Sequence, residues 1–447
     1  MYQVPPMSLI QECRQTLKLA FPLVIGQVSQ MLLGVADTVM IGKLGVNELA
    51  VLTFANSLFY VPFVFGIGVL TAISVFTSNA QGANDAQAGR ASCRLGVYIS
   101  TVLGLLLFGV MWLFSQNLQI FGQPKEVEES TGLFFQIIMA SMVPALMSLA
   151  LKNHADALGR PWPAFWIFLL GVGLNVFLNW IMIYGNLGCP AWGLEGAAIA
   201  TLISRIAILV AMFVWLYHAK GLREWVPYHW FRMPTKLETR RFLGIGFPAS
   251  LQMICEVSAF SAAGLLMGKF GATAMAAHQV ALMCAATAFM VPLGLSMALS
   301  VRIGSAIGAG QVERLRKIVV SGWWLGATWA LIGASIFFFF GKWLASLYID
   351  ELPVIELAAS IMVVVGVFQL FDSLQIGSVA MLRGLHDARM PAVMGFVAYW
   401  VIGIPIGVLL SIRLDYGAVG VWCGLAVGLM VACGLLVPRL WKLTRGL

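Results

Sequence analysis

Three acidic residues lie inside long apolar stretches of the sequence. They are Asp37 in LLGVADTVMIG, Glu256 in LQMICEVSAF and Asp372 in GVFQLFDSLQIG, and no lysine or arginine stands within one helical turn of any of them. An ionised group at the centre of a bilayer costs about 2.5–3.5 kcal/mol on insertion scales, so such residues mark functional sites by default. In hydrocarbon a carboxyl group binds a proton, or a cation once it is deprotonated. The alternative is a carboxyl group satisfied by a neighbouring helix or placed near the membrane surface.

Two asparagines form a second candidate group. Asn175 and Asn179 lie in GLNVFLNWIMIYG, and a spacing of four residues puts both amides on one helix face. Amide carbonyls are hard oxygen ligands that suit hard cations. With Asp37 and with Thr201 of the following apolar stretch, they predict a small cation or proton site. Hydrogen bonding between helices is the competing interpretation of the amides.

The composition of the chain indicates that these residues lie within a membrane. The chain has 447 residues, of which 60% are hydrophobic and only 10% are charged, whereas soluble domains average about 25% charged residues. This excludes an ordinary soluble enzyme, a disordered chain and a nucleic-acid-binding protein. The net charge of +8 is explained by the lysines and arginines that concentrate in cytoplasmic loops.

Twelve apolar stretches are long enough to cross a bilayer as helices, which takes roughly 20 residues each. The opening segment up to Thr16 has no apolar core, so we expect no cleavable signal peptide and insertion through the first span. The predicted spans lie near residues 17–40, 50–76, 95–115, 133–151, 164–186, 194–217, 243–266, 275–301, 319–341, 357–382, 392–411 and 417–438.

The basic residues predict the orientation of the spans. Placing both termini in the cytoplasm puts most of the 27 lysines and arginines on the cytoplasmic side, as the positive-inside rule requires. We expect a multi-pass protein of the inner (plasma) membrane. The longest polar stretch is a basic cytoplasmic loop near 219–241, which separates an N-lobe, residues 1–225, from a C-lobe, residues 226–447.

The two halves are related in sequence. A shift of 226 places Phe21-Pro22 on Phe247-Pro248 and Gly42-Lys43 on Gly268-Lys269, and further matches continue at shifts of 228 and 224. Six spans per copy make the repeats parallel, which is a transporter architecture with its substrate path near the midplane. The acids break the repeat, because Asp37 falls on an alanine and Glu256 on a glutamine. We therefore expect different roles for the two lobes.

Enzymatic functions find no support in the motifs. GxxxxGK[ST], HExxH and GxSxG sequences are all missing from the chain, so neither a P-loop nor a metal-protease or hydrolase site is predicted. A channel is less consistent with acids divided between duplicated lobes than alternating access is. Flexible and aromatic side chains are candidates for an adaptable substrate cavity. They are Met253, Met283, Met290 and Phe368.

Several of these segments together resemble MATE (multidrug and toxic compound extrusion) transporters over essentially the whole chain. The segments are FP followed by GVADTVMIGKLG, then GIGVLTAISV and GLEGAAIAT. Glu256 and Asp372, with asparagine at position 179 where an acid would indicate the DinF branch, resemble the NorM branch.

The resemblance implies a V-shaped bundle of two lobes that exports organic cations and other amphiphiles in exchange for Na⁺ or H⁺, with no cofactor and as a monomer. It assigns Asp37, Asn175, Asn179 and Thr201 to a cation or proton site in the N-lobe. It assigns Glu256 and Asp372 to a cation site in the C-lobe, which would be the Na⁺ site. The family often has an aromatic hydroxyl group there, which Phe368 lacks. The main alternative is a flippase for a lipid-linked saccharide, which would favour a cavity lined by arginines.

Overall fold

The computed structural model describes residues 8–117 and 125–445, and within these ranges every regular element is helical. Twelve helical segments have the length and apolar character needed to cross a membrane. The predicted all-α, twelve-span fold is therefore confirmed.

The helices of the first six spans are longer than the apolar stretches that predict them, because only the central part of each must be apolar. They are α1 Leu9–Gly42, α2 Val46–Gly82, α3 Ala86–Ser115, α4 Lys125–Ala140, α5 Met142–Ala157, α6 Pro161–Tyr184 and α7 Gly193–His218, with the short 3₁₀ segments η2 Asn186–Gly188 and η3 Arg223–Trp225 in the connections. The fourth span is formed by α4 and α5 together, which are interrupted at Ser141.

The second six spans follow the same order. They comprise α8 Lys236–Met267, the 3₁₀ segment η4 Gly268–Phe270, α9 Ala272–Gly308, α10 Val312–Ser346, α11 Leu352–Gly384, α12 Arg389–Phe396, η5 Val397–Gly403, α13 Ile404–Val408, η6 Leu409–Arg413 and α14 Gly417–Arg445. The segments η5 and η6 are π-helical, so the eleventh span is not the regular α-helix that the sequence predicts over 392–411.

Glycine and proline explain the irregular eleventh span. Pro405 lacks an N–H group, and glycines on two helices allow their backbones to approach closely. A Cβ atom on Gly424 of α14 would overlap the backbone of Gly407, and one on Gly428 would lie 3.1 Å from the Cα atom of Gly403. The eleventh and twelfth spans therefore pack backbone against backbone at these positions.

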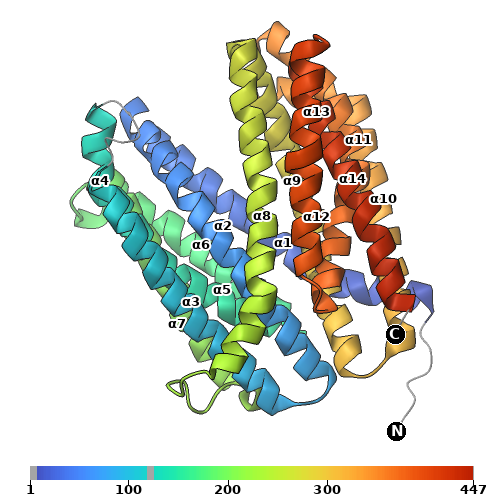
Figure 1. The fold of residues 1–447 in the computed structure, drawn as a ribbon. Helices are drawn as coiled ribbons and strands as arrows, with labels where there is room; N and C mark the ends of the chain where they lie inside the picture. Colours follow the sequence, from blue (N-terminus) through green and yellow to red (C-terminus); the bar gives the residue numbers. More distant parts are fainter. Residues whose placement is uncertain (1–7, 118–124, 446–447) are drawn as a thin grey trace. The chain divides into compact units, whose positions relative to one another are not determined.

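The chain divides into two compact units. One comprises Met1–Val24 and Phe247–Leu447, as far as the described residues reach, and the other comprises Ile25–Gly246. Figure 1 shows the helices of each unit running alongside one another. In the second unit α5 packs against α2, α3 and α7, and in the first unit α11 packs against α9, α10 and α14. The same helix of the repeat is therefore central in both.

The unit boundaries fall inside two helices. They lie in α1 after Val24 and in α8 after Gly246, each within two residues of the repeat-related prolines Pro22 and Pro248. The described beginning of α1 thus packs with the second six spans, and the beginning of α8 packs with the first six. This grouping differs from lobes of residues 1–225 and 226–447 only in these segments and the connection that precedes α8. The assignment of functional lobes stays a prediction.

Candidate ion-coupling sites

Asp37 ends a chain of hydrogen bonds across three helices of the unit Ile25–Gly246. Its Oδ1 accepts from Asn179 Nδ2 at 2.7 Å, and the same nitrogen lies 3.1 Å from Asn175 Oδ1. Asn175 Nδ2 donates to Thr201 Oγ1 at 3.3 Å, and this hydroxyl donates to the Ala197 carbonyl at 3.0 Å. The structure therefore brings together all four residues that the sequence assigned to the first site.

Local sequence explains how these side chains meet. The asparagines are four residues apart on α6, so their amides contact each other and face α1 and α7. The Tyr184 hydroxyl at the end of α6 donates to the Met40 carbonyl at 2.8 Å, which fixes α6 to α1 three residues beyond Asp37. Asn175 and Asn179 are at most 1% exposed. The two amides are thus buried, whereas Asp37 at the end of the chain is half-buried.

Arg205 is a member of this neighbourhood that the sequence did not assign to the site. It lies one turn after Thr201 on α7, interacts electrostatically with Asp37, and donates to Ser141 Oγ at 2.6 Å. Its guanidinium group lies 5.0 Å from the centroid of the Phe59 ring. The rarity of arginine inside an apolar span was the available signal. Arg205 approaches Asp37 from another helix, far from the turn of sequence around the acid.

Glu256 of α8 and Asp372 of α11 form a second acidic pair in the other unit. The two carboxyl groups interact electrostatically with each other, and Glu256 does so with Arg383. Gln252 Nε2 donates to Glu256 Oε2 at 3.0 Å. Asp372 is 2% exposed. The structure therefore places the two predicted C-lobe acids in one polar region.

Among the residues that the structure describes, this region contains two buried polar atoms without a hydrogen-bond partner. They are Oε1 of Gln252, whose amide nitrogen bonds Glu256, and the hydroxyl oxygen of Tyr399, which interacts electrostatically with both acids. Buried polar groups in folded proteins are nearly always paired with protein, water or an ion. The region therefore has spare oxygen ligands, which the site around Asp37 has largely used in its own hydrogen bonds.

The four predicted cavity residues differ in their surroundings. Phe368 is buried, and its ring lies 5.9 Å from that of Phe260 and 6.3 Å from that of Trp422, edge to face in both cases. Met283 is exposed, and Met253 and Met290 are half-buried. Phe368 is thus a packing residue between α8, α11 and α14. The role of these four residues in binding substrate stays a prediction.

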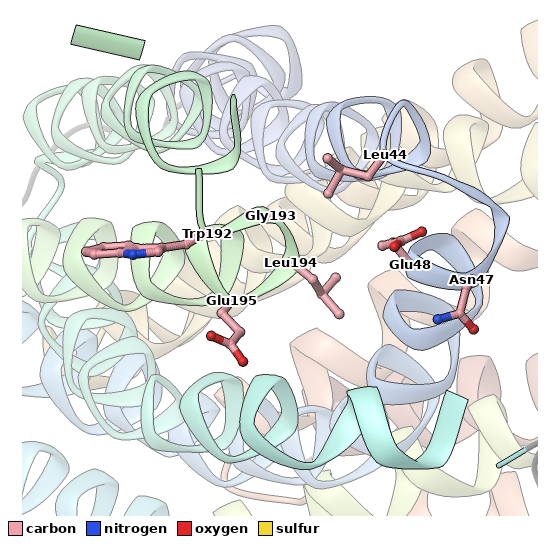
Figure 2. Close-up of a pocket in the computed structure, with 7 residues that line it drawn as sticks. All are labelled: Leu44, Asn47, Glu48, Trp192, Gly193, Leu194 and Glu195. Carbon is pink, nitrogen blue, oxygen red and sulfur yellow. The ribbon is translucent and has the colours of Figure 1, made fainter. Parts of the chain in front are cut away.

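A separate pocket of about 320 Å³ lies between the beginning of α2 and the beginning of α7 (Figure 2). It contains none of the predicted site residues. Its lining includes two acids from the first turns of these helices, where acidic residues are also favoured by the helix dipole. The lining residues are Leu44, Asn47, Glu48, Trp192, Gly193, Leu194 and Glu195.

The fold and sites together define a helical membrane transporter with two repeat-related halves. The MatE family model matches residues 22–181 and 248–409, one segment within each predicted repeat. The probable multidrug resistance protein NorM of Rhizobium meliloti (strain 1021) is 34% identical over 439 residues, covering 97% of this chain and 94% of that protein. The corresponding protein of Agrobacterium fabrum is 32% identical over 437 residues, with the same coverage.

Solved structures have the same fold at lower sequence identity. The Vibrio cholerae MATE transporter VcmN in its bent form has a TM-score of 0.86 at 22% identity, covering 98% of each chain. The eukaryotic MATE transporter AtDTX14 has a TM-score of 0.87 at 20% identity, with the same coverage. This chain belongs to the MATE family, and its relatives are NorM proteins. It is therefore a transporter and not an enzyme, as predicted.

Proposed function

We propose that the protein is a multidrug efflux antiporter that exports organic cations and other amphiphilic drugs in exchange for Na⁺ or H⁺ by alternating access. Membership of the MATE family and the names of its NorM relatives support drug export. One observation supports ion coupling above all others. The hydrogen-bonded chain from Thr201 through two amides ends on the carboxylate of Asp37 inside a membrane span.

The first site changes its hydrogen bonding when Asp37 gains a proton. As a carboxylate, Asp37 only accepts, and it does so from the Asn179 amide nitrogen. A protonated carboxyl group is also a donor. Asn179 Oδ1 is buried and, among the described residues, has no partner. Rotation of the Asn179 amide presents this oxygen to the protonated acid, and the change passes to Asn175 and Thr201.

The second site suits a cation because its acids are accompanied by spare oxygen atoms. Glu256 and Asp372 supply carboxylates, the hard ligands that hard cations prefer. An ion of single charge that moves inward gains about 2.3 kcal/mol for each 100 mV of membrane potential. This gain drives export only if ion and substrate stabilise different conformations. A separate carboxylate site in each unit would allow the ion and the substrate to stabilise different conformations.

The remaining parts of the proposal concern the setting of the transporter. The protein spans the inner (plasma) membrane with both termini in the cytoplasm, as the distribution of basic residues favours. Its partners are small organic cations and the lipid bilayer, without nucleic acid, and it acts as a monomer. The only further requirement is the coupling ion, with no bound cofactor.

Transport by purified protein in liposomes tests the proposal. A fluorescent organic cation is loaded, and its export is driven first by a Na⁺ gradient and then by a proton gradient. The variants Asp37→Asn and Glu256→Gln remove one carboxylate each. Asp350→Asn and Glu351→Gln are matched controls, because both residues are exposed in the connection between α10 and α11.

Each result has a distinct meaning. Na⁺-driven export that Glu256→Gln abolishes supports a cation site in the unit that includes Phe247–Leu447. Export under protons alone, lost in Asp37→Asn, keeps drug antiport but places coupling at Asp37. Failure under both gradients by folded protein contradicts multidrug antiport and favours the lipid-linked saccharide flippase.

A further inference from the structure

Tyr399 is a buried tyrosine that the predicted site does not include. It lies in the π-helical segment η5 and is 1% exposed. Within the described ranges its hydroxyl oxygen has no hydrogen-bond partner. π-helical turns inside α-helices are rare and occur frequently at functional sites, and a buried tyrosine hydroxyl group usually has a partner. Both features indicate that this hydroxyl group serves a ligand.

The surrounding helices place η5 against the acidic part of α8. Trp400, the next residue, donates its Nε1 hydrogen to the Cys255 carbonyl at 3.2 Å and lies 3.3 Å from Ser258 Oγ. These two residues flank Glu256 in the sequence. One turn before Tyr399, a Cβ atom on Gly395 would lie 3.7 Å from the Cγ atom of Gln252. The segment is thus packed along the face of α8 that includes Glu256.

The second acid reaches the same place from α11. Phe368, one turn before Asp372, packs edge to face on Phe260, one turn after Glu256, with ring centroids 5.9 Å apart. Tyr399 interacts electrostatically with both carboxyl groups. Three oxygen-bearing side chains from α8, α11 and η5 therefore lie in one region of one unit, with Asp372 and Tyr399 buried and Glu256 half-buried.

These groups have the chemistry of a cation site. Two carboxylates and a hydroxyl group are hard oxygen ligands. Phe368 has no hydroxyl group to offer from α11, whereas Tyr399 on η5 has one and interacts electrostatically with the same acids. We propose that the Tyr399 hydroxyl oxygen is the third protein ligand of an alkali cation held by Glu256 and Asp372. This inference rests on the proposed cation site and adds the residue that completes it.

Binding of ²²Na⁺ to the purified full-length protein tests the inference without transport. Loss of a group that only hydrogen-bonds a metal ligand lowers metal affinity by about ten- to a hundredfold, so loss of a direct ligand in Tyr399→Phe should lower Na⁺ affinity by at least about tenfold. Tyr416→Phe is the matched control, because Tyr416 is 63% exposed, and it should bind as the original protein does. Glu256→Gln should abolish binding.

A rescue variant separates ligation from packing. Adding Phe368→Tyr to Tyr399→Phe places a hydroxyl group one turn before Asp372 and should restore Na⁺ affinity to within a few-fold. A purely structural role of Tyr399 would leave the double variant as weak as the single one. Thermal unfolding of each variant in detergent, measured without Na⁺, shows whether Tyr399→Phe has altered the fold.

The outcomes distinguish this inference from the function on which it depends. Unchanged affinity in Tyr399→Phe, with binding lost in Glu256→Gln, overturns the role of Tyr399 and leaves the acidic site intact. A Na⁺ affinity that neither variant changes overturns the cation site itself. Weak binding in Tyr399→Phe that Phe368→Tyr restores supports the three-ligand site.

Discussion

The helices that open the two repeats, α1 and α8, are held at their beginnings by contacts of different chemistry. The shift of 226 relates Thr16 to Phe242 and Phe76 to Arg302. At the beginning of α1, Arg302 of α9 donates to Thr16 and to the carboxylate of Glu12. At the beginning of α8, Phe242 stacks on Phe76 of α2, with centroids 6.1 Å apart and planes inclined by 16°. The contact at the beginning of α1 is ionic, and the contact at the beginning of α8 is aromatic.

A displacement of one residue in the helix caps explains why the acids differ. In α1, Ser8 and Gln11 cap each other through two backbone N–H groups, at 2.8 and 3.3 Å. In α8 the corresponding pair is Thr235 and Glu238, at 2.7 and 3.2 Å. Glu238, the repeat equivalent of Glu12, is therefore occupied by the cap. Because Gln11 performs that task in α1, Glu12 is free to reach the guanidinium groups.

The two groups of membrane acids also differ, in the hydrogen bonding of their polar neighbours. Asp37 belongs to a chain of hydrogen bonds through neighbouring amides and a hydroxyl group, in which Asn179 Oδ1 is the buried atom without a described partner. Glu256 and Asp372 lie near polar atoms of two other residues that, in the described part of the chain, lack partners. A hydrogen-bonded chain responds to a proton by changing its donors and acceptors, whereas spare oxygens can hold an ion. The duplicated scaffold thus carries two unlike sites, and variants in both copies test this difference.

The largest effect is expected from Glu12→Ala. Glu12 is 0% exposed and pairs with Arg302 and with Arg314 Nε, the latter at 2.7 Å. Removing one partner from a buried ion pair costs about 3–5 kcal/mol, because the other charge is left uncompensated. Equilibrium unfolding in mixed micelles measures this loss. Glu12→Asp should recover only part of the lost stability, because the shorter side chain cannot reach both guanidinium groups. If Glu12→Ala lowers the free energy of unfolding by less than about 1 kcal/mol, the scale of a surface ion pair, the ionic contact does not stabilise the beginning of α1 as proposed.

The next largest effect is expected from Asn179→Ala. The substitution removes the only amide that joins Asp37 to Asn175 within the described hydrogen-bonded chain. A hydrogen bond to a charged group contributes about 1.5–3 kcal/mol, so proton-driven export should fall by about ten- to a hundredfold. Asn186→Ala is the control, because Asn186 lies in the connection after α6, is partly exposed and bonds the Trp180 carbonyl. Binding of ²²Na⁺ should be unchanged, and its loss would show that the two sites are not separate.

Sequence patterns predicted the parts of this molecule that depend on local chemistry. Hydropathy predicted the twelve spans, and the repeat matches predicted a duplication in which the family model matches once within each copy. The spacing of Asn175 and Asn179 predicted a shared helix face. Three features depend on packing between distant helices and were missed: the approach of Arg205 to Asp37, the π-helical turns around Tyr399 and the burial of Glu12. Glu12 falls in the opening segment up to Thr16, and the lack of an apolar core there gives no sign of its partners on α9 and α10.

A smaller effect is expected from Thr201→Val, which keeps the side-chain shape and removes the hydroxyl group. Thr201 accepts a neutral hydrogen bond from Asn175 at 3.3 Å, at the end of the chain remote from the carboxylate. A bond of this kind contributes about 0.5–1.5 kcal/mol, so proton-driven export should fall about two- to tenfold. Thr201→Ser keeps the hydroxyl group and should transport normally. Equal losses in the two variants would point to packing and not to hydrogen bonding.

The smallest effect is expected from Glu238→Ala, although this residue is the repeat equivalent of Glu12. Glu238 is partly exposed and accepts hydrogen bonds only from Thr235 among the contacts described for it. Interactions of an acid with a surface helix N-terminus contribute about 0.3–1 kcal/mol. Equilibrium unfolding should therefore show a loss several times smaller than that of Glu12→Ala, measured in the same micelles. Equal losses would mean that both acids stabilise their helices to the same extent. The one-residue displacement of the caps would then have no energetic consequence.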